Sequence, residues 1–201
     1  MKQGPFEYPA LETPRLRLRK LTTADAQAMF QYCSDPAVTR FTTWYPHPSQ
    51  DVTEAFIRAA IRMYEEGQAA PWGIEDKAAG SLIGTCGFVN WSTQHAKAEL
   101  GYALSQAYWR QGYMTEAVRA LMSYGFEIMQ LVRIEARCHV DNRASANVLE
   151  KNGMQLEGIM RKHLFAKGRF EDVCMYAMIH EENGRRRETA SRAAGEFFSG
   201  I

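Results

Sequence analysis

The sequence has few cysteines and no long apolar run. Its four cysteines, Cys33, Cys86, Cys138 and Cys174, include no C-x-x-C pair. This argues against a structural zinc site, fits a reducing compartment and predicts small buried side chains. Nowhere do about 18 consecutive apolar residues occur, so no membrane-spanning helix is expected. No apolar signal region follows Met1, and we therefore expect a cytoplasmic protein without a membrane partner.

The chain also lacks an excess of either charge. Its 24 basic and 23 acidic residues leave a formal net charge of +1. A balanced chain has no global attraction to nucleic acid or to an anionic membrane surface, so direct nucleic-acid binding is not expected. Apolar residues are plentiful: 46% of the 201 residues are hydrophobic, which is enough to bury one substantial core.

Periodicity indicates strands and helices in the first half of the chain. Residues 15–19 alternate apolar and basic side chains, which predicts a strand with inward leucines and a solvated face of arginines. Helices are expected from residue 22 or 23 to about 33 and over residues 49–66, with an aromatic loop over residues 44–48 between them. Residues 70–74, 82–89 and 98–104 predict three strands of an antiparallel meander.

The second half of the chain predicts a crossover. A helix over residues 115–129, a strand over residues 133–140 and a helix over residues 144–151 imply parallel pairing with the preceding strand. Two further strands over residues 154–165 and 170–179 are joined by a short turn that contains Gly168. We expect one mixed-sheet α/β domain over residues 1–180, followed by a polar tail over residues 181–201.

The most informative stretch is a polar turn over residues 108–117, in which Gly112 leads from a predicted strand into a predicted helix. The first amides of a helix have no partner inside the helix and lie at the positive end of the helix dipole. Such a turn can therefore bind a phosphate, although a glycine before a helix also occurs in ordinary turns.

Two other segments accompany this turn. Glu99-Leu100-Gly101-Tyr102 precedes it, and Asn142-x-x-Ser145 with Val148-Leu149-Glu150-Lys151-Asn152-Gly153 follows it. Together they closely resemble the GNAT superfamily of N-acetyltransferases, and within it the ribosomal-protein N-terminal acetyltransferases, over residues 12–176. The turn departs from the family pattern of Gln or Arg, two variable residues, Gly, one variable residue, and Gly or Ala. Trp109 and Met114 occupy its outer positions.

This resemblance implies the GNAT fold, with a mixed, mostly antiparallel central sheet, a splayed pair of parallel strands and flanking helices. It also implies acetyl-coenzyme A as cosubstrate and no metal. The pyrophosphate is expected on the amides of residues 110–115, the pantetheine arm beside residues 99–104, and Asn142 on polar groups of the arm. The expected cofactor-binding residues are Tyr102, Ala103, Leu104, Arg110, Gln111, Gly112, Tyr113, Met114, Thr115, Asn142 and Ser145.

Acetyl transfer requires one group that accepts a proton from the amine and another that interacts with the departing thiolate. Glu99 is the first candidate for the base, directly or through water; otherwise it is a solvated carboxylate at a strand end. The resemblance places Ser145 near the cofactor sulfur as a proton or hydrogen-bond donor; otherwise it only helps to start a helix. Gly101 either marks a β-bulge or relieves crowding. No catalytic role is assigned to Tyr176, His139 or His163.

The predicted reaction is direct attack of a primary amine on acetyl-coenzyme A in a ternary complex. The expected acceptor is the N-terminal α-amine of a protein, such as a ribosomal protein, because a pKa of about 7.7 to 8.0 leaves part of it neutral. A small amine, namely a polyamine, an antibiotic or an amino acid, is an alternative, and so is a non-catalytic acyl-coenzyme A-binding module. Residues 41–49 and the helix over residues 49–66 are expected to help shape the acceptor cleft, with Trp44 and Tyr45 alternatively as core anchors. Both a monomer and a homodimer stay open.

Overall fold

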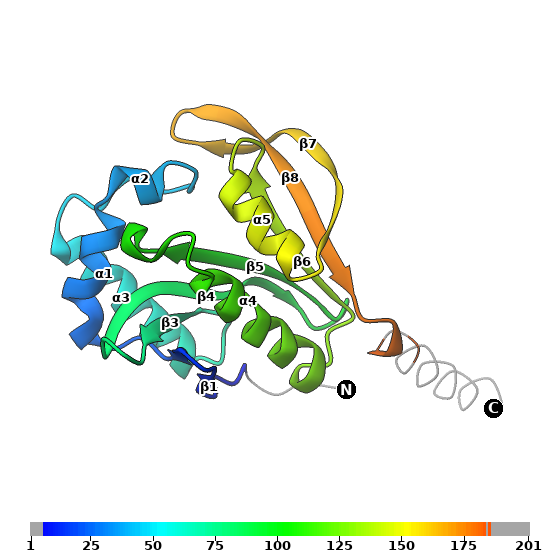
Figure 1. Ribbon diagram of the computed structural model, residues 1–201, viewed down its shortest axis with the longest axis horizontal. Coiled ribbons are helices and arrows are strands. Elements are labelled where there is room, and N and C mark those ends of the chain that lie inside the picture. Colours follow the sequence, from blue (N-terminus) through cyan, green and yellow to red (C-terminus); the bar gives the residue numbers. More distant parts are fainter. Residues whose placement is uncertain (1–5, 184, 186–201) are drawn as a thin grey trace.

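The centre of the protein is an eight-stranded sheet, seen in a computed structural model that describes residues 6–183 and 185 (Figure 1). Its strand order is β1-β2-β3-β4-β5-β6-β8-β7, and only β5 and β6 pair in parallel. The predicted mixed, mostly antiparallel α/β fold is thus confirmed. The strands are β1 (Leu11–Glu12), β2 (Leu16–Arg19), β3 (Pro71–Asp76), β4 (Ser81–Ser92), β5 (Lys97–Leu104), β6 (Arg133–His139), β7 (Gln155–Ala166) and β8 (Arg169–Ile179).

Helices cover both faces of this sheet. They are α1 (Ala26–Cys33), α2 (Pro36–Thr39), α3 (Gln50–Glu65), α4 (Tyr113–Ser123) and α5 (Arg143–Lys151), with short 3₁₀ segments at Thr23–Asp25 and Gln106–Tyr108 and a π-helical turn at Tyr124–Ile128. Figure 1 shows α4 and α5 in front of the sheet. On β4, Ile83 packs in the cluster with α4, whereas its neighbour Leu82 packs in a second cluster with α1 and α3. Successive strand residues point to opposite faces, so the two clusters lie on opposite sides of the sheet.

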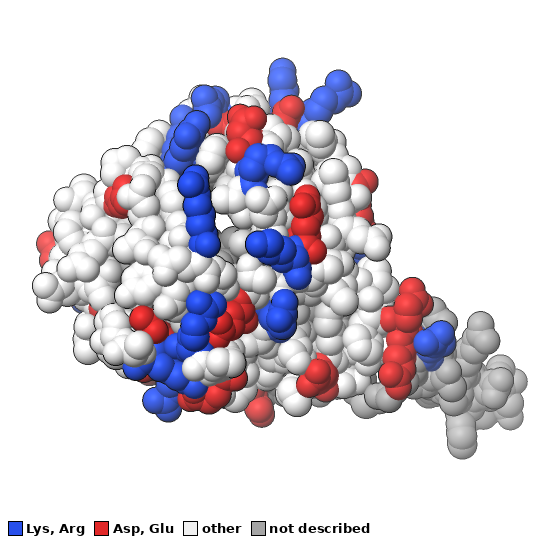
Figure 2. Space-filling model, in the orientation of Figure 1, with Lys and Arg blue, Asp and Glu red and all other residues white. Residues whose placement is uncertain are grey.

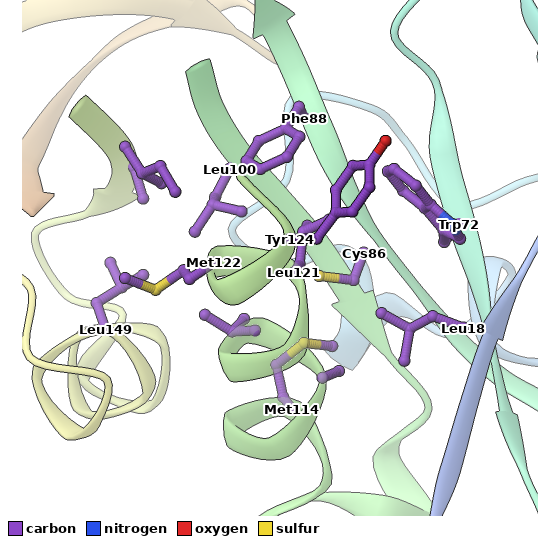
Figure 3. Packing of buried hydrophobic residues seen from close by; sticks show 14 of the residues in the cluster. Leu18, Trp72, Cys86, Phe88, Leu100, Met114, Leu121, Met122, Tyr124 and Leu149 are labelled. Atoms are coloured by element: carbon purple, nitrogen blue, oxygen red, sulfur yellow. The ribbon is translucent and has the colours of Figure 1, made fainter. Parts of the chain in front are cut away.

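The larger core lies beneath α4. Its buried residues recur at positions 114, 117, 118, 121 and 122, which is one face of a helix. Figure 3 shows Met122 extending toward Leu149 of α5 and Leu121 beside Cys86 of β4; Phe88 of β4 and Leu100 of β5 belong to the same cluster. This packing fixes the position of the α4 N-terminus relative to β5.

The structure extends several predicted elements. Helix α4 begins at Tyr113 rather than at residue 115, and β4 continues to Ser92, beyond its predicted end at residue 89. The predicted meander is confirmed as β3, β4 and β5, and the crossover as β5, α4 and β6. The short elements β1 and α2 were not predicted, because two to four residues carry too little periodic signal.

The arginines of residues 15–19 lie on the solvent side of β2, as predicted, with Arg15 and Arg17 side chains 41% and 50% exposed, but they are paired with carboxylates. Arg19 binds Asp25, which is 6% exposed, through Nη2–Oδ1 and Nη1–Oδ2 distances of 2.8 and 2.9 Å, and it also contacts Glu75. Arg15 binds Glu116. A period of two shows which side chains avoid the core, but it does not show which distant carboxylates lie opposite them.

The predicted tail begins too early. Asn183 is buried, and its Nδ2 donates to the carbonyl oxygens of Phe126 and Leu131 at 2.7 and 2.9 Å. The packed part therefore reaches this residue at least. Residues 184 and 186–201 of the predicted tail lie outside the described residues. Among the described helices, none has the length and apolar character to cross a membrane.

Candidate active site

The site is a gap in the sheet between β5 and β6. Residues 97–100 of β5 pair with residues 133–136 of β6, and the pairing then stops. Beyond this point, residues 101–104 pair with β4 on their other side, and residues 137–139 pair with β8. The facing main-chain groups are thus left outside the sheet ladder, where an extended ligand that carries amides could pair with them.

Polar side chains lie at this gap on both faces of the sheet. Tyr102 packs against the larger core under α4 and α5, whereas Ala103 packs against the cluster under α1 and α3. Glu99 shares the parity of Ala103, so its carboxylate lies on the face opposite Tyr102. A ligand bound in the gap can therefore contact a carboxylate on one face of the sheet and a phenolic hydroxyl on the other.

Glu99 is buried and paired. It is 8% exposed, so the alternative of a solvated strand-end carboxylate is wrong. Its Oε1 and Oε2 accept hydrogen bonds from Nε and Nη2 of Arg137 at 2.6 and 2.9 Å, and Oε2 also accepts one from Asn90 at 2.7 Å. Arg137 Nη1 in turn lies 3.2 Å from Nε2 of His163. The carboxylate is therefore held in one orientation on the α1–α3 face.

Ser145 lies across the gap, in the first turn of α5. Asn142 caps this helix, because its Oδ1 accepts a hydrogen bond from the Ser145 N–H at 3.1 Å. The cap uses the amide of Ser145 and not its hydroxyl, and the role of Ser145 beside the cofactor sulfur stays a prediction. Its Oγ lies 2.8 Å from the phenolic oxygen of Tyr102, and that phenol is also 3.3 Å from the Ser145 carbonyl oxygen. Burial raises the pKa of Tyr102 well above its usual value.

The turn before α4 has the geometry expected of an anion site. Gly112 is the N-cap with φ of +81°, and Arg110 also has a positive φ of +60°. Strained backbone of this kind is costly for a residue with a side chain and is often found at functional sites. The first helical hydrogen bond runs from Glu116 N to Gly112 O at 3.0 Å. The amides of residues 113–115 precede it and have no helical acceptor.

Packing explains both departures from the family turn pattern. Trp109 donates its indole N–H to the carbonyl oxygen of Leu104 at 2.8 Å, which ties the turn to the end of β5. Met114 is buried in the larger core. Of the predicted cofactor-binding residues, Met114 can thus offer its backbone amide, while its side chain belongs to the core.

A carboxylate that sequence reasoning missed holds the turn in place. Glu116 accepts hydrogen bonds from Thr13 Oγ1 at 2.6 Å, from the Arg15 amide at 3.0 Å and from Arg15 Nε at 2.7 Å. Burial opposes its ionisation, but these hydrogen bonds outweigh it and hold the pKa of Glu116 below its usual value. The segment that contains Thr13 and Arg15 and the turn before α4 both lie within residues 12–176, over which the sequence resembles the family. Nothing in their spacing along the chain indicates that Glu116 contacts Thr13 and Arg15.

Basic side chains lie around a hollow on the surface near the gap between β5 and β6. Figure 2 shows Lys and Arg side chains around a hollow in the middle of the face that carries α4 and α5. A protein with almost no net charge can still present a local positive field of this kind. The hollow lies near the N-termini of both helices, where backbone dipoles also favour an anion.

Gly101 is needed for space. A Cβ atom there would lie 2.8 Å from Cγ1 of Val89. The bulge lies on the neighbouring strand β4, between Phe88 and Asn90, and not on β5. Of the two alternatives for Gly101, relief of crowding is therefore the one that the structure supports.

Helix α2 and the segment after it lie against the end of β6 and the β7–β8 hairpin. The ring centroids of Phe41 and His139 are 5.2 Å apart, and His139 Nε2 lies 3.0 Å from Glu171 Oε2. Lys167 of the hairpin donates to the carbonyl oxygen of Thr39. Trp44 packs against the cluster under α1 and α3 as an anchor, whereas Tyr45 is 65% exposed and anchors nothing in the core.

One cysteine borders this arrangement, because the Cys138 thiol lies within hydrogen-bonding reach of the Ser145 side chain. All four are free, and three of them are buried, as predicted; Cys174 is half-buried. Burial raises the pKa of Cys138 to about 11 and that of Cys86 to about 12, so both thiols stay protonated near neutral pH. Within residues 6–183 and 185, no three His, Cys, Asp or Glu side chains gather as metal ligands would.

Comparison with known proteins decides the family. Residues 15–155 match the acetyltransferase (GNAT) domain. The chain belongs to the GNAT family of acetyltransferases. It is 36% identical over 172 residues to the Uncharacterized N-acetyltransferase YoaA of Bacillus subtilis. The aligned region covers 86% of this chain and 97% of that protein. As a GNAT enzyme, it is an N-acetyltransferase that uses acetyl-coenzyme A.

Solved structures of GNAT enzymes have the same fold. An acetyltransferase from Salmonella typhimurium, described as modifying the N-terminal serine of ribosomal protein L7/L12, superposes with a TM-score of 0.77 at 26% identity, covering 86% of this chain and 99% of that one. RimL, a ribosomal L7/L12 α-N-protein acetyltransferase in complex with coenzyme A, superposes with a TM-score of 0.76 at 27% identity, covering 85% and 98%.

Proposed function

We propose that this GNAT enzyme acetylates the N-terminal α-amine of a protein by direct attack within a ternary complex. The observation that carries the mechanism is the gap between β5 and β6, with the Glu99 carboxylate on one face and the Tyr102–Ser145 hydroxyl pair on the other. Acetyl transfer needs separate groups for the incoming amine and for the departing sulfur. The two faces supply them.

In the proposed complex, acetyl-coenzyme A lies in the gap. Its pyrophosphate binds the amides of residues 110–115, and its pantetheine arm pairs with residues 101–104. Asn142 directs its Oδ1 to the helix cap, which leaves Nδ2 as the donor for the arm. The left-handed backbone at Arg110 and Gly112 and the basic rim in Figure 2 support this placement.

The amine approaches from the face that carries Glu99. It gives up a proton to Glu99, directly or through water, and its nitrogen then attacks the thioester carbonyl carbon. The attacking nitrogen of the tetrahedral intermediate loses its second proton to solvent, the oxyanion collapses, the carbon–sulfur bond breaks, and coenzyme A leaves as a thiolate beside Ser145. The hydroxyl of Ser145 donates a hydrogen bond to this sulfur. An α-amine suits the site because little help is needed to deprotonate it.

The acceptor part of the proposal rests on two observations. The relatives that act on ribosomal protein L7/L12 share the fold over almost their whole length. The segment expected to shape the acceptor cleft also carries an exposed aromatic side chain: Tyr45 is 65% exposed, and Lys167 Nζ lies 5.9 Å from its ring centroid. Such rings are typical of surfaces that contact a polypeptide. The cytoplasmic location and the oligomeric state stay predictions.

An amine screen tests the proposal. Release of the coenzyme A thiol is followed with peptides that have a free N-terminus, with the same peptides blocked at the N-terminus, and with polyamines, aminoglycosides and free amino acids. We expect turnover of the unblocked peptides, with the acetyl group located on the α-nitrogen by mass spectrometry. Preferred turnover of a small amine would overturn the acceptor assignment. Cofactor binding without turnover of any amine would favour the non-catalytic alternative.

A further inference from the structure

The hydroxyl of Tyr102 has two acceptors on one residue. It lies 2.8 Å from Ser145 Oγ and 3.3 Å from the Ser145 carbonyl oxygen. At these distances the phenolic proton can point to either oxygen, and the Ser145 hydroxyl can either donate to Tyr102 or accept from it. The Cys138 thiol is a further neighbour of the Ser145 side chain. The Tyr102–Ser145 pair itself has two arrangements that differ only by rotation of two hydroxyl groups.

Both partners are held by rigid elements. Ser145 lies in the first turn of α5, where its N–H is bound by the capping side chain of Asn142. Tyr102 lies in β5 opposite Cys86, which is fully buried, and its ring packs against the larger core. Both side chains are half-buried, so they border the gap rather than lie beneath it. The hydrogen bond thus joins two fixed points at the expected position of the cofactor sulfur.

We propose that Tyr102 is a positioning residue that orients the Ser145 hydroxyl toward the departing thiolate. This inference rests on the proposed function. Without cofactor, Ser145 donates to the Tyr102 oxygen and Tyr102 donates to the Ser145 carbonyl. With the sulfur beside Ser145, the serine proton turns to the sulfur and the tyrosine proton turns to Ser145 Oγ. A hydrogen bond accepted by Oγ polarises its O–H and strengthens the bond to sulfur.

No proton has to move from oxygen to sulfur in this arrangement. A thiol titrates near about 8.5 and an ordinary phenol near about 10, so proton transfer from Tyr102 to the thiolate is unfavourable. Burial of Tyr102 raises its pKa and makes that transfer still less favourable. Coenzyme A therefore leaves as a hydrogen-bonded thiolate, and no covalent bond of Tyr102 or Ser145 breaks.

Steady-state kinetics of Tyr102→Phe give the first test. A neutral hydrogen bond that acts in the transition state corresponds to a loss of about fivefold in kcat, with the KM for acetyl-coenzyme A unchanged within about twofold. In a Ser145→Ala background, the same substitution should have no further effect, because Tyr102 acts through Ser145. A fivefold loss that persists in that background, or no loss at all, would overturn the inference.

Tyr124→Phe is the matched control. It also removes a buried phenolic hydroxyl, which donates to the Glu7 carbonyl oxygen at 2.9 Å away from the gap. We expect it to change stability without changing kcat. If both variants lose the same activity, the loss at Tyr102 reflects general destabilisation and the positioning role is wrong.

The thiol of bound coenzyme A gives a readout that needs no acceptor. Its ionisation is followed by the ultraviolet absorbance of the thiolate, after subtraction of the same variant without coenzyme A. We expect the pKa of the bound thiol to be about 0.7 higher in Tyr102→Phe than in the unsubstituted protein, which matches a fivefold loss of thiolate stabilisation. An unchanged value would reject the role of Tyr102 even if acetyl transfer is confirmed. Absence of turnover with every amine, together with the expected pKa difference, would reject the proposed acceptor chemistry and retain the role of Tyr102.

Discussion

Glu99 and Glu135 are two carboxylates in similar surroundings, and only Glu99 lies next to the gap. Comparing them separates a catalytic role from a structural role in the sheet. Glu99 of β5 and Glu135 of β6 are partners in the parallel pairing, and both carboxylates are largely buried and bound by basic side chains. Glu99 lies one residue before the strands separate, whereas Glu135 pairs with Lys97 and Arg133 farther from the gap. The two residues therefore share an environment and differ in their distance from the proposed chemistry.

Glu99→Gln should lower kcat by about 100-fold or more if Glu99 is the base, because general-base catalysis typically contributes that much. The affinity for acetyl-coenzyme A should change little, since the carboxylate lies on the acceptor face. Glu135→Gln is the control: it removes a comparable ion pair and should leave kcat within about threefold of the unsubstituted enzyme. Equal activity of both variants would remove Glu99 from the mechanism.

A substitution of Gly112 tests whether the turn before α4 binds the cofactor. Its φ of +81° disfavours any side chain, although a Cβ atom would come no closer than 3.5 Å to Arg15 Nη2. Gly112→Ala should therefore cost about 1 to 2 kcal/mol of stability through backbone strain and should weaken acetyl-coenzyme A binding about tenfold or more as the amides shift. Gly80→Ala has the same type of backbone, with φ of +61° and open space around it, in the turn between β3 and β4. It should lose stability and keep its affinity, as measured by calorimetric titration. Unchanged affinity in both variants would contradict the assigned phosphate site.

At the scale of elements, the N-terminal segment and α4 are joined by one carboxylate. Glu116 accepts hydrogen bonds from the loop between β1 and β2, while its own amide begins the helical ladder of α4. An unpaired acidic residue in this first turn would repel a bound phosphate. Its ion pair with Arg15 reduces that repulsion, so the contact orders the turn and also balances its charge.

Glu116→Gln should lower the free energy of unfolding by about 1 kcal/mol at neutral pH, a modest value because Arg15 is substantially exposed. The folded state lowers the pKa of Glu116 below its usual 4.5. The stabilisation is therefore complete above about 4.5 and is lost as the pH falls through the lower pKa of the folded state. Urea denaturation of both proteins between neutral pH and about pH 3 measures this difference. A difference that stays constant over that range would contradict the assigned contact.

At the scale of the whole molecule, the candidate site is an interruption of the central sheet between two well-packed hydrophobic clusters. The cluster under α4 and the cluster under α1 and α3 cover the two faces of the sheet, and the gap opens where β5 and β6 separate. A ligand bound in the gap supplies hydrogen-bond partners for the main-chain groups of β5 and β6 that have no neighbouring strand there. Ligand binding should therefore stabilise the whole domain rather than one loop.

Acetyl-coenzyme A at 100 times its dissociation constant should raise the free energy of unfolding by about 2.7 kcal/mol, because it binds the folded state alone. A thermal-shift titration measures this effect, with adenosine nucleotides and nicotinamide cofactors as controls. A shift with acetyl-coenzyme A that the controls do not produce is the expected result. No shift at saturating concentration would contradict the cofactor site.

The sequence by itself determined the order and type of most elements and, through its motifs, the family; the cofactor residues that it names stay predictions. These features are local: alternation at residues 15–19, helical spacing at residues 113–122 and the glycine before α4 are each set by neighbouring residues along the chain. Their boundaries moved by a few residues, since packing decides where an element ends.

Only the tertiary structure decided which polar groups meet. The pairing of Glu99 with Arg137, of Ser145 with Tyr102 and of Glu116 with Arg15 joins residues that are 38 to 101 positions apart. Periodicity assigns a side chain to a face, but strand order and register decide which residue lies opposite it. For this reason the sequence could predict Glu99 and Ser145 as candidates, while their hydrogen-bond partners, and the two faces of the sheet on which they lie, followed from the folded sheet.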